Sequence, residues 1–355
     1  MPIKKKYIFL FFSFLLLLSL NRCISYLFHL GKEQARILHS RVPIAEILQK
    51  QDLDEKKKKG LELSQKARQF AVKRLGLNSE GGFLYYVELD REEIGWHVTA
   101  SYPLEFKSYT WWFPIVGSVP YKGYFFKELA ETEEAELKKK GLDTRLRITA
   151  GYSTLGWFSD PVFSSQLRAS EDEIIALVFH EMAHATVYFD GDARFNESYA
   201  SFVEEEGTRL YYVEESSEES AKILLERQKK QKERDRLIKL LQEYALKLDA
   251  TYKTDLSNLE KEKNKKRIIT EFKEKVIQIL EPEGERLQKF RERELNNEDF
   301  IGVLRYHSGN DFFQDEFKKV GKNFSRFHEN MRKLKSLSIK ERAKLLGVPE
   351  GIIDP

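Results

Sequence analysis

Two histidines four residues apart constrain this chain more than any other feature of its sequence. They lie in I-I-A-L-V-F-H-E-M-A-H-A-T-V-Y, which contains no proline and follows the capping sequence Ser170-Glu171-Asp172-Glu173. A helix that begins at Ser170 places His180 and His184 on one face, one turn apart, so both imidazoles can reach one ion. Neutral imidazole is a ligand that suits zinc. The sequence therefore predicts a Zn²⁺ site on this helix.

The residue after the first of these histidines is a glutamate. Glu181 lies on an adjacent face of the same helix, where its carboxylate can take a proton from an activated water and return it to a leaving amine. The alternative is a structural cluster without metal, which would bury two imidazoles and a carboxylate in an apolar helix at considerable cost. We therefore expect Glu181 to be the catalytic base of a zinc-dependent hydrolase.

A catalytic zinc site takes three protein ligands and leaves one position open. The segment F-N-E-S-Y-A-S-F-V-E-E-E-G follows a turn rich in Asp and Gly, and we expect a second helix to begin near Asn196. Its Glu197 is the predicted third ligand, and Glu204, about two turns further along a similar face, is the alternative. Two acidic residues of the turn are interpreted as turn formers or as hydrogen-bond partners of the imidazoles, namely Asp190 and Asp192.

Other residues near this motif are candidates for substrate contacts. The strand-like segment T-R-L-R-I-T-A precedes the helix and could lie at a sheet edge, where an extended peptide adds as another strand. Tyr152 and Tyr306 are candidates to donate a hydrogen bond to the tetrahedral oxyanion, with a packed tyrosine as the alternative for each. His97 and His307 are interpreted as structural. This pattern favours a peptide or protein substrate.

The first 30 residues have the character of a targeting segment. Lys4, Lys5 and Lys6 precede the apolar run Y-I-F-L-F-F-S-F-L-L-L-L-S-L, as in a signal peptide. We expect residues 1–30 to be a signal peptide or an uncleaved membrane anchor that places the domain outside the cytoplasm. Cys23, the only cysteine, follows the run and is a candidate for lipoprotein acylation. A single cysteine excludes an intrachain disulfide and a thiolate cluster for metal.

The rest of the chain predicts an α+β fold. Residues 83–126 are rich in Tyr, Trp, Val and Phe interrupted by Gly and Pro, which is typical of strands and turns, and residues 127–140 have a helical composition. We expect N-terminal helices, the small sheet and the zinc-binding core within residues 31–213, and a helical part over 214–355. Lys and Arg number 60 against 57 Asp and Glu, a net charge of +3 that gives no indication of a nucleic-acid partner.

Two apolar stripes at helical spacing mark the C-terminal part. They predict a helical hairpin packed on the domain, with an exposed coiled-coil site for a partner as the alternative. The first stripe comprises Leu237, Leu241, Tyr244, Leu248 and Tyr252, and the second comprises Ile268, Ile269, Phe272, Val276 and Leu280.

Several segments together resemble the bacterial putative aminopeptidase family, from Cys23 to about Leu346. They are C-I-S-Y-L, G-K-E-Q-A-R-I-L-H-S-R-V-P-I, W-W-F-P-I-V-G-S-V-P-Y-K-G-Y-F, G-Y-S-T-L-G-W-F-S-D-P-V-F-S, G-D-A-R-F-N-E-S-Y-A-S-F-V-E and, more weakly, E-L-N-N-E-D-F. The resemblance implies a zincin-like metallopeptidase domain with a small sheet, an active-site helix and a largely helical C-terminal part. The metal ligands and the base that it implies are the same as those above, namely His180, His184, Glu197 and Glu181.

The predicted function is therefore peptide-bond hydrolysis by a zinc metallopeptidase, an aminopeptidase by resemblance. The segment G-x-M-E-N, with which well-studied zinc aminopeptidases hold a free amino terminus, has no counterpart in this sequence, so endopeptidase action stays open. One alternative function is a non-catalytic, envelope-anchored zinc protein that binds a partner through its helical region. Another is a zinc hydrolase that acts on other material, such as the cell wall.

Overall fold

The computed structural model describes residues 26–113, 117–149, 159–280, 284–306 and 308–348. The chain divides into two compact units, residues 1–42 and 43–355. In the first unit, residues 26–40 form a helix. Residues 1–25 of the predicted targeting segment, which include Cys23, lie outside the described residues. Within the described ranges, no helix combines the length and the apolar character needed to cross a membrane.

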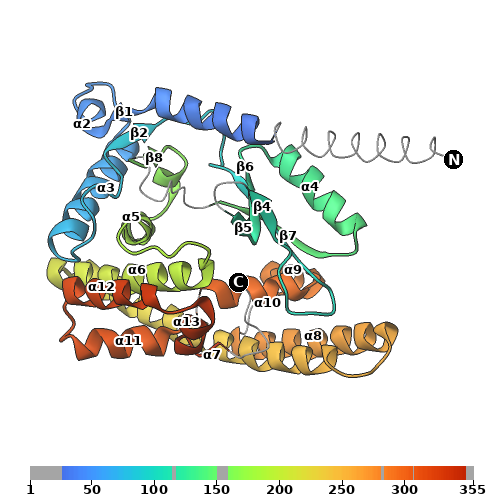
Figure 1. The fold of residues 1–355 in the computed structure, drawn as a ribbon. Helices are drawn as coiled ribbons and strands as arrows, with labels where there is room; N and C mark the ends of the chain where they lie inside the picture. Colours follow the sequence, from blue (N-terminus) through green and yellow to red (C-terminus); the bar gives the residue numbers. More distant parts are fainter. Residues whose placement is uncertain (1–25, 114–116, 150–158, 281–283, 307, 349–355) are drawn as a thin grey trace, which may run out of the picture. The chain divides into compact units, whose positions relative to one another are not determined.

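The described part of the second unit is mainly helical and contains small sheets (Figure 1). Its helices are α2 (Ile44–Ile47), α3 (Glu55–Lys73), α4 (Lys127–Lys139), α5 (Glu171–His184), α6 (Ala193–Glu215), α7 (Glu218–Tyr252), α8 (Asn258–Leu280), α9 (Gly284–Glu292), α10 (Asn297–Tyr306), α11 (Asn310–Lys319), α12 (Phe324–Lys333) and α13 (Ile339–Leu345). Short 3-10 helices are η1 (Gln166–Arg168) and η2 (Leu334–Ser336). The α+β class predicted from the sequence is confirmed.

The strands are β1 (Val42–Pro43), β2 (Tyr85–Val87), β3 (Trp96–Ser101), β4 (Trp111–Phe113), β5 (Gly117–Val119), β6 (Tyr121–Tyr124), β7 (Asp143–Ile148) and β8 (Val162–Phe163). β2 to β7 lie in the segments where the sequence predicted strands, whereas the two-residue strands β1 and β8 were not predicted. β2 pairs in parallel with β8, and β4 pairs in antiparallel fashion with β5. β3 lies between β6 and β7, antiparallel to both, so β7 is an outer strand of this sheet.

The two faces of the β6-β3-β7 sheet have different roles. Side chains alternate across a strand, so His97 of β3, which pairs with Gly123 and with Arg147, shares a face with both. The opposite face packs on α4, where Glu133 accepts a hydrogen bond from the Tyr124 hydroxyl at 2.8 Å. The face that carries His97 is therefore available to line a site.

Helices α5 and α6 form the centre of the unit and pack closely on each other. Helix α5 begins as predicted, because the Ser170 N–H donates to Glu173 Oε2 at 2.9 Å in a capping box. Helix α6 begins at Ala193 rather than near Asn196. The reason is that Asp192 Oδ1 accepts from the Phe195 N–H at 3.1 Å and caps the helix one turn earlier.

Helices α7 and α8 form the predicted hairpin (Figure 1). Its apolar stripes pack inward, toward α10. Phe272 contacts Phe300 with ring centroids 4.9 Å apart, and the Tyr252 hydroxyl donates to Asn297 Oδ1 at 2.8 Å. Residues 43–355 form one compact unit. The boundary expected near residue 213, between the metal-binding core and the helical C-terminal part, stays a prediction.

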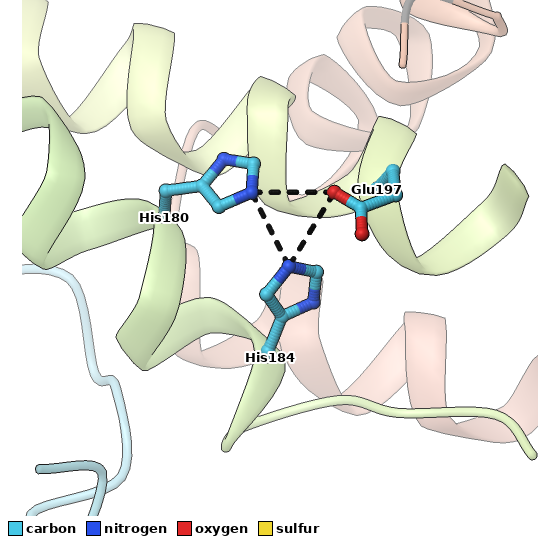
Figure 2. A group of neighbouring side chains, drawn as sticks. All are labelled: His180, His184 and Glu197. Carbon is cyan, nitrogen blue, oxygen red and sulfur yellow. Dashed lines mark hydrogen bonds and ion pairs between the residues drawn. The ribbon is translucent and has the colours of Figure 1, made fainter. Parts of the chain in front are cut away.

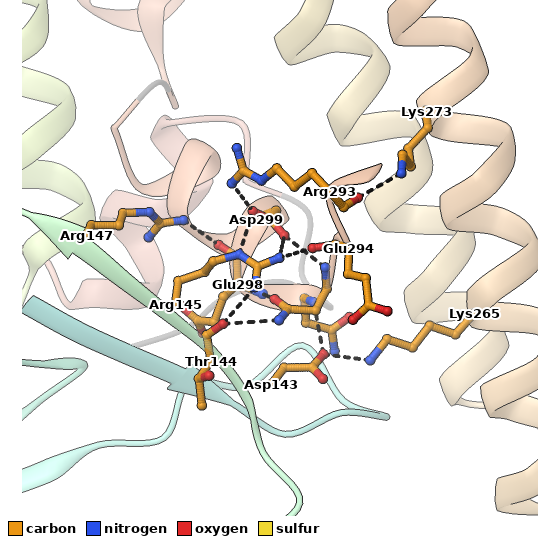
Figure 3. A network of polar contacts seen from close by, with 12 residues as sticks. Asp143, Thr144, Arg145, Arg147, Lys265, Lys273, Arg293, Glu294, Glu298 and Asp299 are labelled. Atoms are coloured by element: carbon orange, nitrogen blue, oxygen red, sulfur yellow. Dashed lines mark hydrogen bonds and ion pairs between the residues drawn. The ribbon is translucent and has the colours of Figure 1, made fainter. Parts of the chain in front are cut away.

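A polar network attaches the start of α10 to β7 (Figure 3). Arg145 Nε donates to Asp299 Oδ1 at 2.9 Å, and Asp143 Oδ2 accepts from the Asn297 N–H at 3.0 Å. Arg147 Nη2 donates to the Glu298 carbonyl oxygen at 3.1 Å. Charge-assisted bonds of this kind are stronger than neutral ones, so α10 has a defined position against the sheet.

The buried His328 on α12 gives a testable pH dependence of stability. Its Nε2 lies 2.8 Å from the Leu75 carbonyl oxygen and its Nδ1 2.7 Å from the Tyr199 hydroxyl, so Nε2 donates and Nδ1 accepts. Burial lowers the pKa of His328 to about 4. Between this pKa and the unfolded value of about 6.5, the unfolded chain binds the extra proton, and stability falls as pH falls.

We expect this histidine to contribute a loss of about 2–3 kcal/mol in unfolding free energy between pH 7 and pH 4.5. Urea denaturation of the wild type and of His328→Gln at both pH values measures it. The variant will be less stable at pH 7. Its unfolding free energy will fall by about 2–3 kcal/mol less than that of the wild type between pH 7 and pH 4.5. Equal pH dependence in the two proteins would show that His328 is not the responsible group.

Candidate metal centre

Three side chains from α5 and α6 converge on one point (Figure 2). His180 Nε2 lies 3.2 Å from His184 Nε2 and 3.4 Å from Glu197 Oε2. The distance from His184 Nε2 to Glu197 Oε2 is 3.6 Å. The structure therefore brings together the three residues that the sequence predicted as metal ligands.

These separations fit the donor atoms of a tetrahedral zinc site. Zinc binds imidazole nitrogen and carboxylate oxygen at about 2.0–2.2 Å, which places two tetrahedral ligands about 3.3–3.5 Å from each other. The measured separations of 3.2, 3.4 and 3.6 Å lie close to this range. Two imidazoles and one carboxylate also form a donor set that zinc uses in catalytic sites, with the fourth position open.

Glu204, the alternative ligand, has a different position. Its Oε2 lies 3.0 Å from His180 Nδ1, on the side of the ring away from the convergent Nε2 atoms. A carboxylate that accepts the Nδ1 proton leaves the lone pair of Nε2 available to a metal. Asp192 accepts from Arg342 Nε at 2.6 Å in addition to capping α6, and Asp190 is exposed, so both are turn residues.

The electrostatics of the cluster suit metal binding. Burial alone raises the pKa of Glu197, but hydrogen bonds from the two imidazoles outweigh it and hold the pKa well below the usual range. Burial lowers the pKa of His180, but Glu197 and Glu204 outweigh it, so the pKa lies well above the usual value. A metal would have to displace the His180 proton, and its affinity should therefore fall as pH falls.

Glu181 is buried, with 8% of its surface exposed, at the border of the same site. Burial raises the pKa of its carboxyl group, while the imidazoles of His180 and His184 lower it to a smaller extent. A carboxylate whose basicity is raised by a poorly solvated site is suited to accept a proton from water near neutral pH.

The cluster lies in a cleft of about 800 Å³. One wall consists of α5 and α6, and another consists of the sheet face that carries His97 together with α10. His97, interpreted from the sequence as structural, thus lines the cleft. Of the predicted oxyanion donors, Tyr152 and the side chain of Tyr306 lie outside the described residues, and so does His307.

Several residues of the cleft were not found by sequence reasoning. They are Tyr121, Arg147, Tyr188, Arg227 and Arg305. Only Tyr188 carried a local signal, since it lies four residues after His184. Burial raises the pKa of Tyr188 to about 12, so its hydroxyl stays protonated at neutral pH and can donate a hydrogen bond.

Fold and site together define an α+β protein with a candidate metal centre of two histidines and a glutamate in an open cleft. A family described as putative aminopeptidase matches residues 25–346, and the chain belongs to this family. The family prediction made from the sequence is therefore confirmed, and the family's description suggests a peptidase. Neither a curated protein nor a solved structure matches this chain.

Proposed function

We propose that the protein is a zinc metallopeptidase in which His180, His184 and Glu197 bind the metal and Glu181 is the general base. The observation that carries this proposal is the convergence of three donor atoms at 3.2–3.6 Å, beside a buried glutamate, in a cleft that a peptide can enter. Membership of the putative aminopeptidase family supports the reaction class.

The residues of this chain have distinct roles in the proposed reaction. Zinc, when bound, would lower the pKa of a water toward 7 and polarise the scissile carbonyl group. Glu181 accepts the proton of the attacking water and delivers it to the leaving amine. Glu204 orients the His180 ring, and the Tyr188 hydroxyl is a candidate donor to the developing oxyanion.

A peptide or protein is the proposed substrate. β7 is an outer strand of its sheet, and the Arg147 side chain on this strand lines the cleft, which supports binding of an extended chain. Aminopeptidase and endopeptidase action both fit this arrangement. The partner-binding alternative loses its main support, because the apolar stripe of the α7–α8 hairpin packs on α10. We further propose attachment to the envelope through residues 1–30, on their sequence alone.

Metal analysis of the purified full-length protein tests the proposal. We expect close to one zinc per chain and hydrolysis of members of a peptide library. Chelation should abolish the hydrolysis, and added zinc should restore it. A folded protein that neither contains nor takes up zinc would contradict the proposal.

A further inference from the structure

Arg305 is a buried cation that faces the cleft without an ion-pair partner among the described residues. It lies in the last turn of α10, 7% of its surface is exposed, and its side chain lines the cleft. Its main-chain oxygen accepts a hydrogen bond from Ser198 Oγ at 3.1 Å. The guanidinium group has a favourable electrostatic interaction with the Glu298 carboxyl group, but neither Glu298 oxygen accepts a hydrogen bond from it. A buried charge without a hydrogen-bonded counter-ion is costly, so an anion from outside the chain would stabilise it.

A second guanidinium lies on the same wall. Arg147 extends from β7 across Gly302 of α10, and a Cβ atom at position 302 would lie only 2.8 Å from Arg147 Nη2. The glycine thus lets the arginine rest directly on the helix. The polar network between β7 and α10 includes Arg147, whose Nη2 donates to the Glu298 carbonyl oxygen (Figure 3). The wall formed by the sheet and α10 therefore carries two positive charges.

This wall is close to the proposed reaction centre. His97 lies on this wall, and its pKa is affected by the negative charge of Glu197 and by the positive charges of Arg147 and Arg305. Burial, supported by the two arginines, lowers the pKa of His97 to about 4. His97 is therefore neutral at pH 7 and leaves the positive charge of the wall to the arginines.

The carboxylates among the described residues of the cleft are already engaged. Glu173 accepts the capping hydrogen bond of α5, and Glu204 accepts from His180. Glu181 and Glu197 belong to the proposed base and ligand set. Among the described lining residues, the arginines rather than the carboxylates are therefore suited to bind a charged group of the substrate, and such a group would be negatively charged.

We propose that Arg305, with Arg147 beside it, binds a carboxylate of the peptide substrate, so that the enzyme selects peptides with an acidic group near the scissile bond. This inference rests on the proposed function and adds the substrate class. The carboxylate can belong to an Asp or Glu side chain or to the C-terminus of a short peptide. A guanidinium binds either in the same bidentate manner.

Matched peptides test the inference. One pair places Glu or Gln near the cleavage site in a C-terminally amidated peptide, and a second pair has Gln with a free or an amidated C-terminus. Binding is measured by calorimetry on zinc-loaded, full-length Glu181→Gln protein, and turnover is measured on the wild type. We expect the carboxylate-bearing member of at least one pair to bind about 10–100-fold more tightly. The pair that shows the preference identifies the source of the carboxylate.

Arginine variants assign the preference to a residue. In the same background, Arg305→Gln should remove the preference, and Arg305→Lys should keep part of it, because lysine retains the charge without the bidentate geometry. Arg227→Gln is the matched control. Arg227 lines the same cleft, but its guanidinium lies 3.4 Å from Asp172 Oδ2 and 3.6 Å from Glu205 Oε2. This variant should retain the preference. Circular dichroism and zinc content establish that each variant is folded and loaded.

The outcomes separate this inference from the proposed function. Equal binding of both members of each pair, or a preference that survives in Arg305→Gln, would overturn the inference and leave zinc-dependent peptidase activity intact. Absence of zinc or of any peptide hydrolysis would overturn the proposed function instead. If Arg305→Gln does not fold, the matched peptides and the Arg305→Lys variant still test the inference. An undiminished preference for the carboxylate-bearing peptide in the lysine variant would contradict bidentate binding.

Discussion

Replacement of Glu181 by glutamine is expected to lower kcat/KM for peptide hydrolysis by about 10²–10⁴-fold, the range attributed to general acid–base catalysis. Glutamine has nearly the same shape but cannot accept the proton of the attacking water. Glu181 is not among the three convergent donors, so the variant should retain its zinc. Its fold should also persist, because the side chain is buried and a neutral amide avoids the cost of burying a charge.

Metal analysis and steady-state kinetics on the same preparation measure both effects. Glu206→Gln is a suitable control, because Glu206 lies on α6 outside the cleft lining and pairs with Arg209 at 2.9 Å. It should remain close to wild type in activity. Full peptidase activity in a zinc-loaded Glu181→Gln protein would exclude this residue as the base. Unchanged biological function without any hydrolysis would favour the non-catalytic alternative.

Replacement of Glu197 by alanine is expected to remove nearly all bound zinc and, with it, the peptidase activity. Glu197 supplies one of the three donor atoms, and two imidazoles alone leave the site incomplete. Glu204→Ala should have a smaller effect, a loss of about 10–100-fold in zinc affinity, because it removes only the partner of His180 Nδ1. Competition with a chelator of known affinity measures both variants at one pH.

Asp190→Ala is the control for this pair, since Asp190 is exposed in the turn between α5 and α6. It should bind zinc as the wild type does. The assignment of ligands would be reversed if Glu204→Ala lost its zinc while Glu197→Ala retained it. Loss of zinc in both variants to the same extent would mean that the two carboxylates act as one unit, contrary to the separate roles that their positions indicate.

The local features of the site were predictable because they depend on short-range geometry. The capping box at Ser170 predicts where α5 begins, and the spacing of His180 and His184 places them on one face whatever the remainder of the fold. The start of α6 was predicted less well. From sequence alone, Asp192 can either form a turn or cap a helix. In the structure it caps α6, and its position is also fixed by a hydrogen bond from Arg342, which is distant in sequence.

The choice between Glu197 and Glu204 needed the tertiary structure. Both residues follow the same turn and lie on a similar helix face, so spacing alone leaves both able to approach the metal. The packing of α6 on α5 decides between them. It brings Glu197 Oε2 to 3.4 Å from His180 Nε2 and directs Glu204 to the other nitrogen of the same ring.

By itself, the sequence predicted the helix that bears His180 and His184, the candidate base Glu181, the hairpin of α7 and α8, and the family, but it left the third ligand open between Glu197 and Glu204. Only the tertiary structure decided the composition of the cleft, where Arg147 of β7 meets Arg305 of α10. Helix and strand periodicities relate residues that are a few positions apart. The two arginines come from distant segments and lie close together because the sheet and α10 pack on each other, through contacts such as Arg145 with Asp299. No local sequence pattern predicts this packing.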